Sequence, residues 1–513
     1  MFKNHPKGLL AAALANMGER FGFYTMMAIL LLFLQSKYAL DTTSAGLIYS
    51  VFYALIYLLA LVGGIVADKT KNFKGTILVG LCIMAFGYVL MAIPSPTPVQ
   101  NKVLFLGLTL VGLFTIAFGN GLFKGNLQAL VGKMYDKPEY SKMRDAGFSL
   151  FYMFINVGAI FAPLMAVGIR NWWVAKAGFV YKSELPALCH SYLAGKTESA
   201  TQLSQYASEV GYTDITLFAK SYLNVFNEGF NWAFGVAIFA MAISLVVYLV
   251  NKKYFPTGNE ALIEATKVDA NGKTVAMEAK EIRQRMYALF AVFGVVIFFW
   301  FSFHQNGLTL TKFAQEYTDL SMININLGFT RIQGAEIFQS FNPLCVVLLT
   351  PVVMALFGWL SAKGKEPSTP KKIAIGMGIA ALGFVVMAVG SYFSNLPLNA
   401  AINPDLGGTP LTDAQRVTPF LLIGTYVILT IAELFISPLG ISFVSRVAPP
   451  KYQGLMQGLW LCATAVGNQL LFIGAILYSN IPIWLTWTVF VVVCTISMMT
   501  MIFMLKWLER VAK

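Results

Sequence analysis

Long runs of apolar residues alternate with short polar stretches along the whole chain. A transmembrane helix needs roughly 20 consecutive, predominantly apolar residues. By this criterion the pattern predicts twelve spans, at 7–36, 43–67, 75–94, 103–131, 142–168, 230–250, 284–312, 331–358, 371–393, 416–444, 452–477 and 482–508. We therefore expect an all-α integral membrane protein.

The composition supports a membrane protein and changes the meaning of the net charge. Of the 513 residues, 57% are hydrophobic and only 12% are charged, whereas a soluble domain has about 25% charged residues. A net charge of +13 would suggest a nucleic-acid partner in a soluble protein. In a membrane protein, Lys and Arg gather in cytoplasmic loops. We therefore expect membrane lipid, and no nucleic acid, as a partner.

The distribution of Lys and Arg predicts the orientation. If the N-terminus is cytoplasmic, 25 of the 37 Lys and Arg residues fall in cytoplasmic segments, and the bias keeps its direction from loop to loop. Glu19 and Arg20 interrupt the first apolar run, so we interpret it as a span rather than a secretory signal. Both termini are expected in the cytoplasm, with the protein in the plasma (inner) membrane.

No residue pattern indicates an enzyme, a metal site or an organic cofactor. The five cysteines are scattered, and the three histidines do not cluster. The sequence contains no HExxH motif and suggests no Ser/His/Asp arrangement. We therefore expect neither catalysis nor a bound metal.

Two polar segments divide the chain. The segment 171–228 is predicted to be an exterior insertion, as short amphipathic helices or a small cap. The segment 252–283 reads as a cytoplasmic linker that separates six spans from six, and it has no apolar run that would add further spans. The expected domains are 1–251, including the insertion, the linker 252–283, and 284–513. This division is typical of the major-facilitator architecture, in which two six-helix bundles enclose a substrate site near the bilayer midplane. We expect a monomer.

A charge inside a membrane span is costly unless it faces a cavity or a partner, and four residues are informative for this reason. Glu19 and Arg20 lie in the first span, Lys124 in the fourth and Glu433 in the tenth. A cation and an anion on opposite halves suit a zwitterion, with its carboxylate near Lys124 and its ammonium near Glu433. The alternative is that these residues form structural ion pairs between helices.

Polar uncharged side chains in the apolar runs are further candidates for the site. Asn156 and Asn342 have the donors and acceptors to bind a peptide backbone, or equally to bond neighbouring helices. Tyr24 and Tyr57 lie in the first two spans.

Several of these residues belong to motifs that resemble the proton-coupled oligopeptide transporter family. The motifs are FSLFYMFINVGAI (Phe148–Ile160), the segment Ala432–Trp460 with Glu433, Ser437 and Pro438, GERFGFY (Gly18–Tyr24) and FNPL (Phe341–Leu344). They occur in the family's order and in both halves.

The resemblance implies a role for each matching position. Arg20 and Lys124 would lie near the peptide carboxylate, and Glu433 would bind the amino terminus. Asn156 and Asn342 would contact the peptide backbone. Tyr24, Tyr57 and Trp460 would line pockets for the side chains of the peptide, and Ser437 would belong to the site beside Glu433. Proton coupling would involve Glu19, Arg20, Lys124 and Glu433.

The chain departs from the family's pattern at positions linked to protons and gating. Asn16 replaces a Glu that the family usually carries in the first span. Met27 and His304 stand where relatives have an Arg and an acid that pair as an exterior gate. His304 would either titrate in place of the lost carboxylate, since His changes charge near neutral pH, or stay neutral and bonded to a neighbour.

The sequence therefore predicts a secondary transporter that imports di- and tripeptides by proton symport with alternating access, with protons as the coupling ion. One alternative is a carrier of another small solute in the same fold. Another is a peptide carrier whose proton coupling is altered or absent, which the Asn16 replacement motivates.

Overall fold

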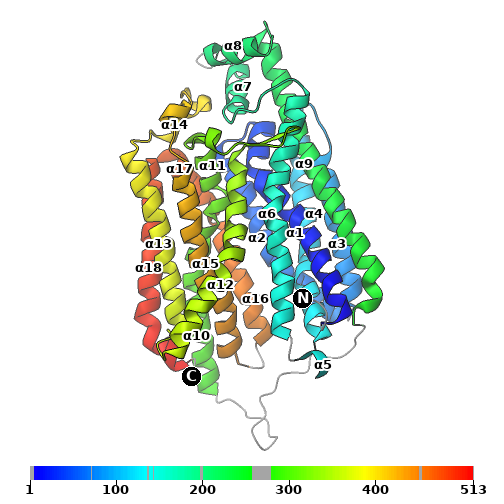
Figure 1. Ribbon diagram of the computed structural model, residues 1–513, viewed down its shortest axis with the longest axis vertical. Helices are drawn as coiled ribbons and strands as arrows, with labels where there is room; N and C mark the ends of the chain where they lie inside the picture. The colour runs from blue at the N-terminus through cyan, green and yellow to red at the C-terminus, as the bar shows by residue number, and fades with distance from the viewer. Residues whose placement is uncertain are drawn as a thin grey trace, which may run out of the picture.

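Long helices that run roughly parallel to one another make up most of the computed structural model (Figure 1). The structure describes residues 5–70, 72–135, 138–141, 144–196, 200–256, 279–449 and 453–511. Within them, twelve helical segments are long and apolar enough to cross a membrane, so the predicted number of spans is confirmed. Most of the predicted linker, at 257–278, lies outside the described residues.

The N-terminal half of the described chain (residues 5–256) is helical. Its elements are α1 (Lys7–Tyr38), α2 (Thr42–Thr70), α3 (Phe73–Ala92), α4 (Lys102–Met134), α5 (Pro138–Ser141), α6 (Arg144–Lys176), α7 (Leu185–Leu193), α8 (Ala200–Glu209), α9 (Ile215–Asn251) and the 3₁₀ turn η2 (Lys252–Tyr254).

The C-terminal half (residues 279–511) contains, besides its helices, a β-hairpin whose two strands have two residues each. Its elements are α10 (Ala279–Phe303), η3 (His304–Gly307), α11 (Thr309–Glu316), η4 (Leu320–Met322), β1 (Ile325–Asn326), β2 (Arg331–Ile332), η5 (Ala335–Ser340), α12 (Phe341–Ala362), α13 (Thr369–Phe393), α14 (Asn399–Ile402), η6 (Pro404–Leu406), η7 (Asp413–Gln415), α15 (Phe420–Val447), α16 (Gln453–Gln469), α17 (Leu471–Asn480) and α18 (Ile483–Val511). The two strands are antiparallel, with Ile325 opposite Ile332.

Side-chain caps fix several helix starts. The Asn72 side chain accepts a hydrogen bond from the backbone N–H of Gly75, and Asn101 accepts one from Leu104. Asp214 accepts from both Thr216 and Leu217 at the start of α9. These bonds satisfy N–H groups that the first helical turn leaves unpaired.

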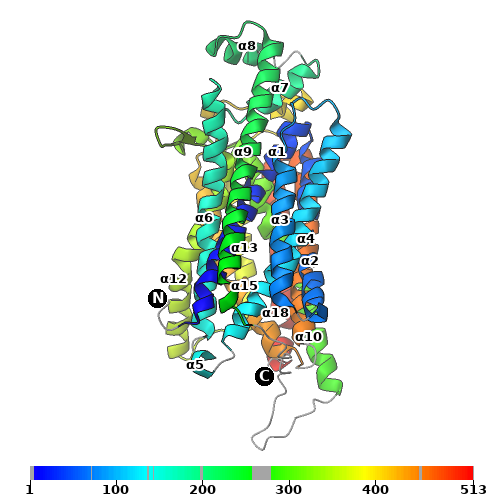
Figure 2. The same ribbon diagram turned by 90° about the vertical axis from the view of Figure 1, so that its right-hand side faces the viewer.

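The sixth span begins earlier than the sequence predicts. It was expected to start at residue 230, but α9 begins at Ile215, directly after its Asp214 cap. The added turns carry polar side chains such as Lys220, Asn224 and Glu228, so a criterion based on apolar residues cannot detect them. Figure 2 shows α9 projecting past its neighbours to α7 and α8.

The predicted insertion 171–228 is divided among four helices. Its two ends continue α6 and α9, and its middle forms α7 and α8. Leu203 and Ala207 are the buried residues of α8, which makes that helix amphipathic as expected. We call the end of the molecule that carries α7 and α8 the cap end. The opposite end, where both chain termini lie (Figure 1), is the termini end.

Each half has its own apolar core. One cluster of buried side chains comes mainly from α1–α9 and another from α10–α18. Glycines allow close helix contacts in the first half: a β-carbon at Gly80 of α3 would lie 2.7 Å from the carbonyl oxygen of Gly119 of α4. Small residues of this kind are typical where membrane helices pack tightly.

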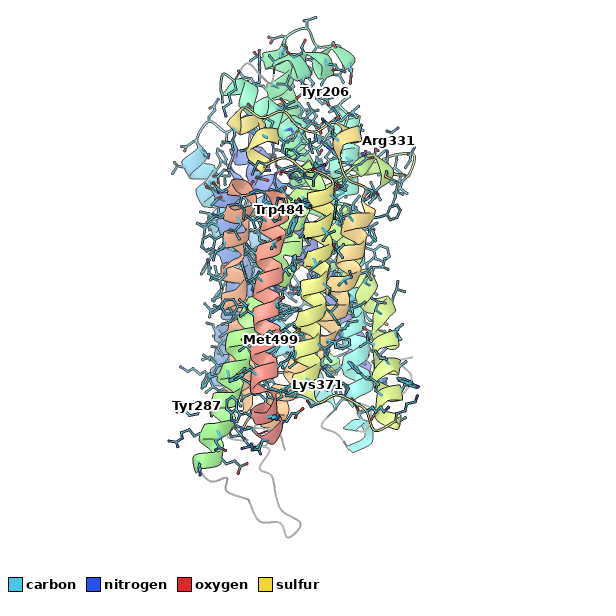
Figure 3. The ribbon with its side chains drawn as sticks, turned by 90° about the vertical axis from the view of Figure 1, so that its left-hand side faces the viewer. Tyr206, Tyr287, Arg331, Lys371, Trp484 and Met499 are labelled. Carbon is cyan, nitrogen blue, oxygen red and sulfur yellow. The ribbon has the colours of Figure 1, made fainter. Side chains whose placement is uncertain are left out.

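The outer surface is strongly apolar. Met499, which Figure 3 labels on α18, is 57% exposed, and Phe503 on the same helix is 90% exposed. A soluble protein rarely exposes contiguous apolar surface of this kind. The twelve spans and this surface together make the chain an integral membrane protein.

Candidate functional site

Glu19 and Arg20 form a buried ion pair near the middle of α1. Arg20 donates from Nε to Glu19 Oε2 at 2.5 Å and from Nη2 to Oε1 at 2.7 Å. Asn120 of α4 donates to the same Oε1 at 2.7 Å, and the Arg20 guanidinium lies 4.6 Å from the centre of the Phe23 ring. The pair thus links α1 to α4, as a structural ion pair would. A role in proton coupling or carboxylate binding stays a prediction.

Lys124 of α4 is a half-buried cation that lies against an aromatic ring. Its Nζ lies 4.2 Å from the centre of the Tyr57 ring on α2. In the part of the chain that the structure describes, it forms no ion pair with a carboxylate. Arg20 and Glu19 are its electrostatic neighbours in the same half, and His304 is one in the other half. An ammonium in this position favours an anionic ligand, because an unpaired charge in a poorly hydrated site is costly.

Glu433 of α15 is the corresponding anion in the C-terminal half. Asn342, in the first turn of α12, donates from Nδ2 to Glu433 Oε2 at 2.8 Å and to Thr430 Oγ1 at 3.0 Å. Asn342 therefore orients the carboxylate. Among the described residues Glu433 has no cationic partner, and it does not pair with Lys124.

Four tyrosines of the N-terminal half lie within electrostatic range of the Glu433 carboxylate. They are Tyr24, Tyr53, Tyr57 and Tyr152. The rings of Tyr53 and Tyr57 are 5.9 Å apart, one helical turn from each other on α2. The structure thus brings together Lys124, the tyrosines and Glu433 around the interface between the halves.

Sequence reasoning did not include Tyr53 and Tyr152 in the site. A signal for Tyr53 was present, because Tyr49, Tyr53 and Tyr57 recur every four residues and so share one face of a helix. Tyr152 lies in the motif that carried the family resemblance, and 51% of its surface is exposed.

Asn156 is bonded within its own helix. Its Nδ2 donates to the carbonyl oxygen of Tyr152 at 3.2 Å, and the residue is 8% exposed. This bond leaves the amide oxygen available for a ligand or for a neighbouring helix. Both interpretations of Asn156 stay open.

His304 lies where the seventh span changes from α10 to the 3₁₀ turn η3. Its ring centre is 4.7 Å from that of Tyr53 in the other half and 4.8 Å from that of Trp300. Its Nδ1 is 2.5 Å from Oδ1 of Asn468. The geometry agrees with a histidine bonded to a neighbour, and a role in proton transfer stays a prediction.

Ser437 and Trp460, the remaining predicted site residues, differ in their surroundings. Ser437 is one turn after Glu433 on α15, and its Oγ is buried without a hydrogen-bond partner among the described residues. Trp460 is 3% exposed. Its ring packs against Phe293 at 6.1 Å between centres and covers Gly440, where a β-carbon would clash with the indole. Trp460 is thus part of the core in this conformation, and its pocket role stays a prediction.

The arrangement can bind a zwitterion. An ammonium with no ion pair among the described residues and an oriented carboxylate come from opposite halves, and the Tyr57 ring packs against the ammonium. A ligand that contacts both charges would stabilise one relative position of the halves through differential contacts.

A family model described as the POT family, PTR2, matches residues 74–260 and 258–486. These ranges cover most of the chain and reach into both halves.

Several transporters are similar in sequence to this chain over almost its whole length. "Peptide transporter YePEPT" of Yersinia enterocolitica is 29% identical, over 91% of this chain and 87% of its own. "Dipeptide and tripeptide permease B" of Salmonella typhimurium is 26% identical, over 90% and 84% respectively. "Uncharacterized transporter YclF" of Bacillus subtilis is also 26% identical, over 94% and 90%.

Solved structures share the fold at low sequence identity. A crystal structure of a peptide transporter POT in complex with sulfate superposes with a TM-score of 0.72 at 22% identity, covering 100% of this chain and 96% of that one. A POT family transporter in complex with 5-aminolevulinic acid gives a TM-score of 0.69 at 21% identity, covering 100% and 98%. With twelve spans, this fold and a family model that matches most of its length, the chain belongs to the POT family of major-facilitator transporters.

Proposed function

We propose that this POT-family chain imports di- and tripeptides by proton symport, with alternating access. The carrying observation is the pair of complementary charges, Lys124 and Glu433, which belong to different halves and do not neutralise each other. A small peptide has an ammonium at one end and a carboxylate at the other, so it matches both charges at once. Several relatives, among them the Salmonella typhimurium protein, are named dipeptide and tripeptide permeases, which agrees with such a substrate.

Within this proposal the site residues divide by ligand group. Lys124, with Arg20 nearby, attracts the peptide carboxylate, and Glu433 binds the ammonium. Asn342 orients the Glu433 carboxylate through its hydrogen bond. Together with Asn156 it binds the peptide backbone. Side chains of the peptide contact Tyr24, Tyr57, Ser437 and Trp460 when the halves move.

We place the cap end outside the cell and both termini in the cytoplasm. The distribution of Lys and Arg supports this orientation. The plasma membrane is the expected location, the working unit is a monomer, and the halves 1–251 and 284–513 move as two bundles joined by 252–283. One similar solved structure is described as tetrameric PepTSo2, so the mass of the purified protein should be measured by light scattering.

Proton coupling is assigned to Glu19, Arg20, Lys124, His304 and Glu433. Asn16, which is 5% exposed, supplies no carboxylate, and this is the observation that favours a second candidate. In that candidate the chain carries peptides, or another small solute, without using the proton gradient.

Dipeptide uptake into proteoliposomes, with and without an inward proton gradient, tests the proposal. Faster uptake with the gradient is expected. Equal uptake in both conditions would favour the uncoupled carrier. No uptake at all would favour another solute, and competition with a purely anionic and a purely cationic analogue would then identify its charge. An anion carrier would need Lys124 and Arg20 but not Glu433.

A further inference from the structure

The β-hairpin at the cap end exposes a group of large apolar side chains. Phe329 is 72% exposed, and Met322, just before the hairpin, is 58% exposed. Ile325 and Leu327 are exposed between them. Single exposed apolar side chains are common on any protein, whereas a contiguous group usually marks an interaction surface. We call these four residues the apolar tip.

The turn of the hairpin is held by its own backbone and one polar side chain. Asn326 lies opposite Arg331, and the N–H of Leu327 donates to the carbonyl oxygen of Thr330 at 2.9 Å. Gly328 has a φ of 82°, a conformation that glycine adopts without steric cost, and its N–H donates to Asn326 Oδ1 at 2.9 Å. The apolar tip is therefore not needed to form the turn, and its role lies outside the hairpin.

The base of the hairpin is attached to protein. Thr330 donates from Oγ1 to the carbonyl oxygen of Gly168 on α6 at 2.7 Å, and Ile332 is buried in a small apolar cluster. Close to this base, Arg170 of α6 forms a buried ion pair with Glu336 of η5. The tip, by contrast, projects sideways past α6 (Figure 2).

The lipid-facing side of α6 leads directly to the hairpin. Phe161 and Met165 are exposed on α6, and with Gly168 they follow the spacing of one helix face. At 3.6 residues per turn, Phe161 lies two and a half turns after Tyr152, and so on the opposite side of α6 from the candidate peptide site. A β-carbon at Gly168 would contact Thr330 and Ile332. The hairpin therefore continues the apolar surface that contacts lipid.

Three tryptophans mark the water boundary near this level. Trp172 is one turn beyond Gly168 on α6, and its ring centre lies 6.1 Å from that of Trp173 and 6.5 Å from that of Trp232 on α9. Tryptophan is enriched where the membrane meets water. Because the hairpin is bonded to α6 one turn on the membrane side of Trp172, its tip lies at the level of the lipid headgroups.

The charge of the hairpin suits the same surroundings. Between residues 321 and 331 the chain has no acidic residue, and its one charged side chain is the exposed Arg331, which Figure 3 labels at the cap end. A cation beside an apolar group is typical of segments that lie in the membrane interface, where phosphates are within reach. A protein partner could cover the same apolar residues, but lipid already adjoins them along α6.

We propose that this hairpin is a membrane anchor, whose apolar tip inserts into the leaflet on the cap side while Arg331 stays among the headgroup phosphates. The partner of this surface is the lipid itself. Since the hairpin leads through η5 into α12, the anchor ties the cap end of the C-terminal half to the leaflet. The inference goes beyond the proposed function and rests only on the chain being an integral membrane protein.

The accessibility of a spin label tests the anchor. Phe329→Cys is labelled with a nitroxide in a chain whose five native cysteines are replaced, in nanodiscs of phosphatidylethanolamine and phosphatidylglycerol. Power-saturation electron paramagnetic resonance compares collisions with oxygen, which enters lipid, and with a nickel chelate, which stays in water. Ile496→Cys, exposed on α18, is the control for lipid, and Ser204→Cys, exposed on α8, is the control for water.

The label at Phe329 should collide with oxygen more than with nickel, as the label at Ile496 does. The ratio of the two rates should correspond to a depth of about 5–10 Å, which is typical of interfacial segments. Adding Leu327→Asp should move the label toward water and raise its nickel collisions, because interfacial binding increases with buried apolar area. Asn326→Asp adds the same charge without removing an apolar side chain, so its shift should be smaller.

Three outcomes would overturn the proposal. Nickel collisions as frequent as those at Ser204 would place the tip in water. Low rates with both oxygen and nickel would show that a protein surface, such as a second copy of the chain, covers the tip. Equal shifts from Leu327→Asp and Asn326→Asp would attribute the effect to charge alone. If Phe329→Cys does not fold, Leu327→Cys provides a second labelling position on the same tip, and the first two outcomes apply to it unchanged.

Discussion

Replacing Glu433 by Gln tests the zwitterion model most directly. The substitution removes one negative charge and almost no volume. The amide oxygen of Gln can still accept the hydrogen bond that Asn342 now donates at 2.8 Å, so the local geometry should survive. What disappears is the attraction for the peptide ammonium.

The expected magnitude follows from the type of contact. An ammonium about 4 Å from a carboxylate gains about 4 kcal/mol at an effective dielectric constant near 20, and desolvation offsets part of this gain. A hydrogen bond to a charged group contributes about 1.5–3 kcal/mol net. A loss of about 2–3 kcal/mol corresponds to a roughly 30- to 150-fold weaker Kd.

Binding of a dipeptide and of its N-acetylated form should be measured by calorimetry for both proteins. Acetylation removes the ammonium, so the acetylated peptide should bind the parent and the E433Q variant about equally. The unmodified dipeptide should bind the E433Q variant more weakly than it binds the parent protein. E366Q serves as the control for a surface carboxylate. If E433Q binds and transports the dipeptide as the parent does, or if it weakens both ligands equally, then Glu433 does not recognise the ammonium.

Three further predictions concern the other half of the site. Lys124→Met should weaken the binding of a dipeptide by a similar factor, roughly 30- to 150-fold. In the same assay it should leave the binding of a C-terminally amidated dipeptide unchanged, and an equal loss for both ligands would refute a contact between Lys124 and the peptide carboxylate. Asn120→Leu removes the hydrogen bond to the buried Glu19 and should lower the free energy of unfolding by about 1–3 kcal/mol, measurable by thermal denaturation in detergent, and an unchanged melting temperature would contradict it. Asn16→Glu should make uptake depend more steeply on an inward proton gradient in proteoliposomes, whereas an unaltered dependence would show that a carboxylate at this position does not govern coupling.

The fold was predictable because the membrane imposes a simple rule. Spans must be long and apolar, and this pattern is visible in a single sequence. The polar extension of α9 was missed for the same reason, since Lys220 and Glu228 lie on helical turns that the rule counts as loop. The break of the seventh span at His304 was also not predicted, because η3 interrupts a continuous run of apolar residues.

The central site was partly predictable because a charge within a span is rare. Lys124 and Glu433 stood out for this reason, and the structure puts both near the tyrosines of α2. Their individual bonds were not predictable. That Asn120 of α4 donates to Glu19 of α1, and that Trp460 of α16 covers Gly440 of α15, depends on how different helices pack against each other.

Arg170 and Glu336 show where the sequence contained a signal that was not used. Glu336 lies within the predicted span 331–358, so the rule that singled out Glu433 applied to it as well. Arg170 lies between the predicted span 142–168 and the predicted insertion 171–228 and was assigned to neither. Only the structure brings the two together, because 166 residues separate them along the chain.

The length of α9 has a practical consequence for imaging. Its 37 residues span about 55 Å at 1.5 Å per residue, whereas the hydrocarbon core is about 30 Å thick. The helix therefore extends rigidly beyond the bilayer and supports α7 and α8 there. Transporters with little mass outside the membrane are difficult to align as single particles, and here the protein itself provides a folded landmark. An antibody fragment raised against α8 would mark the direction of every particle.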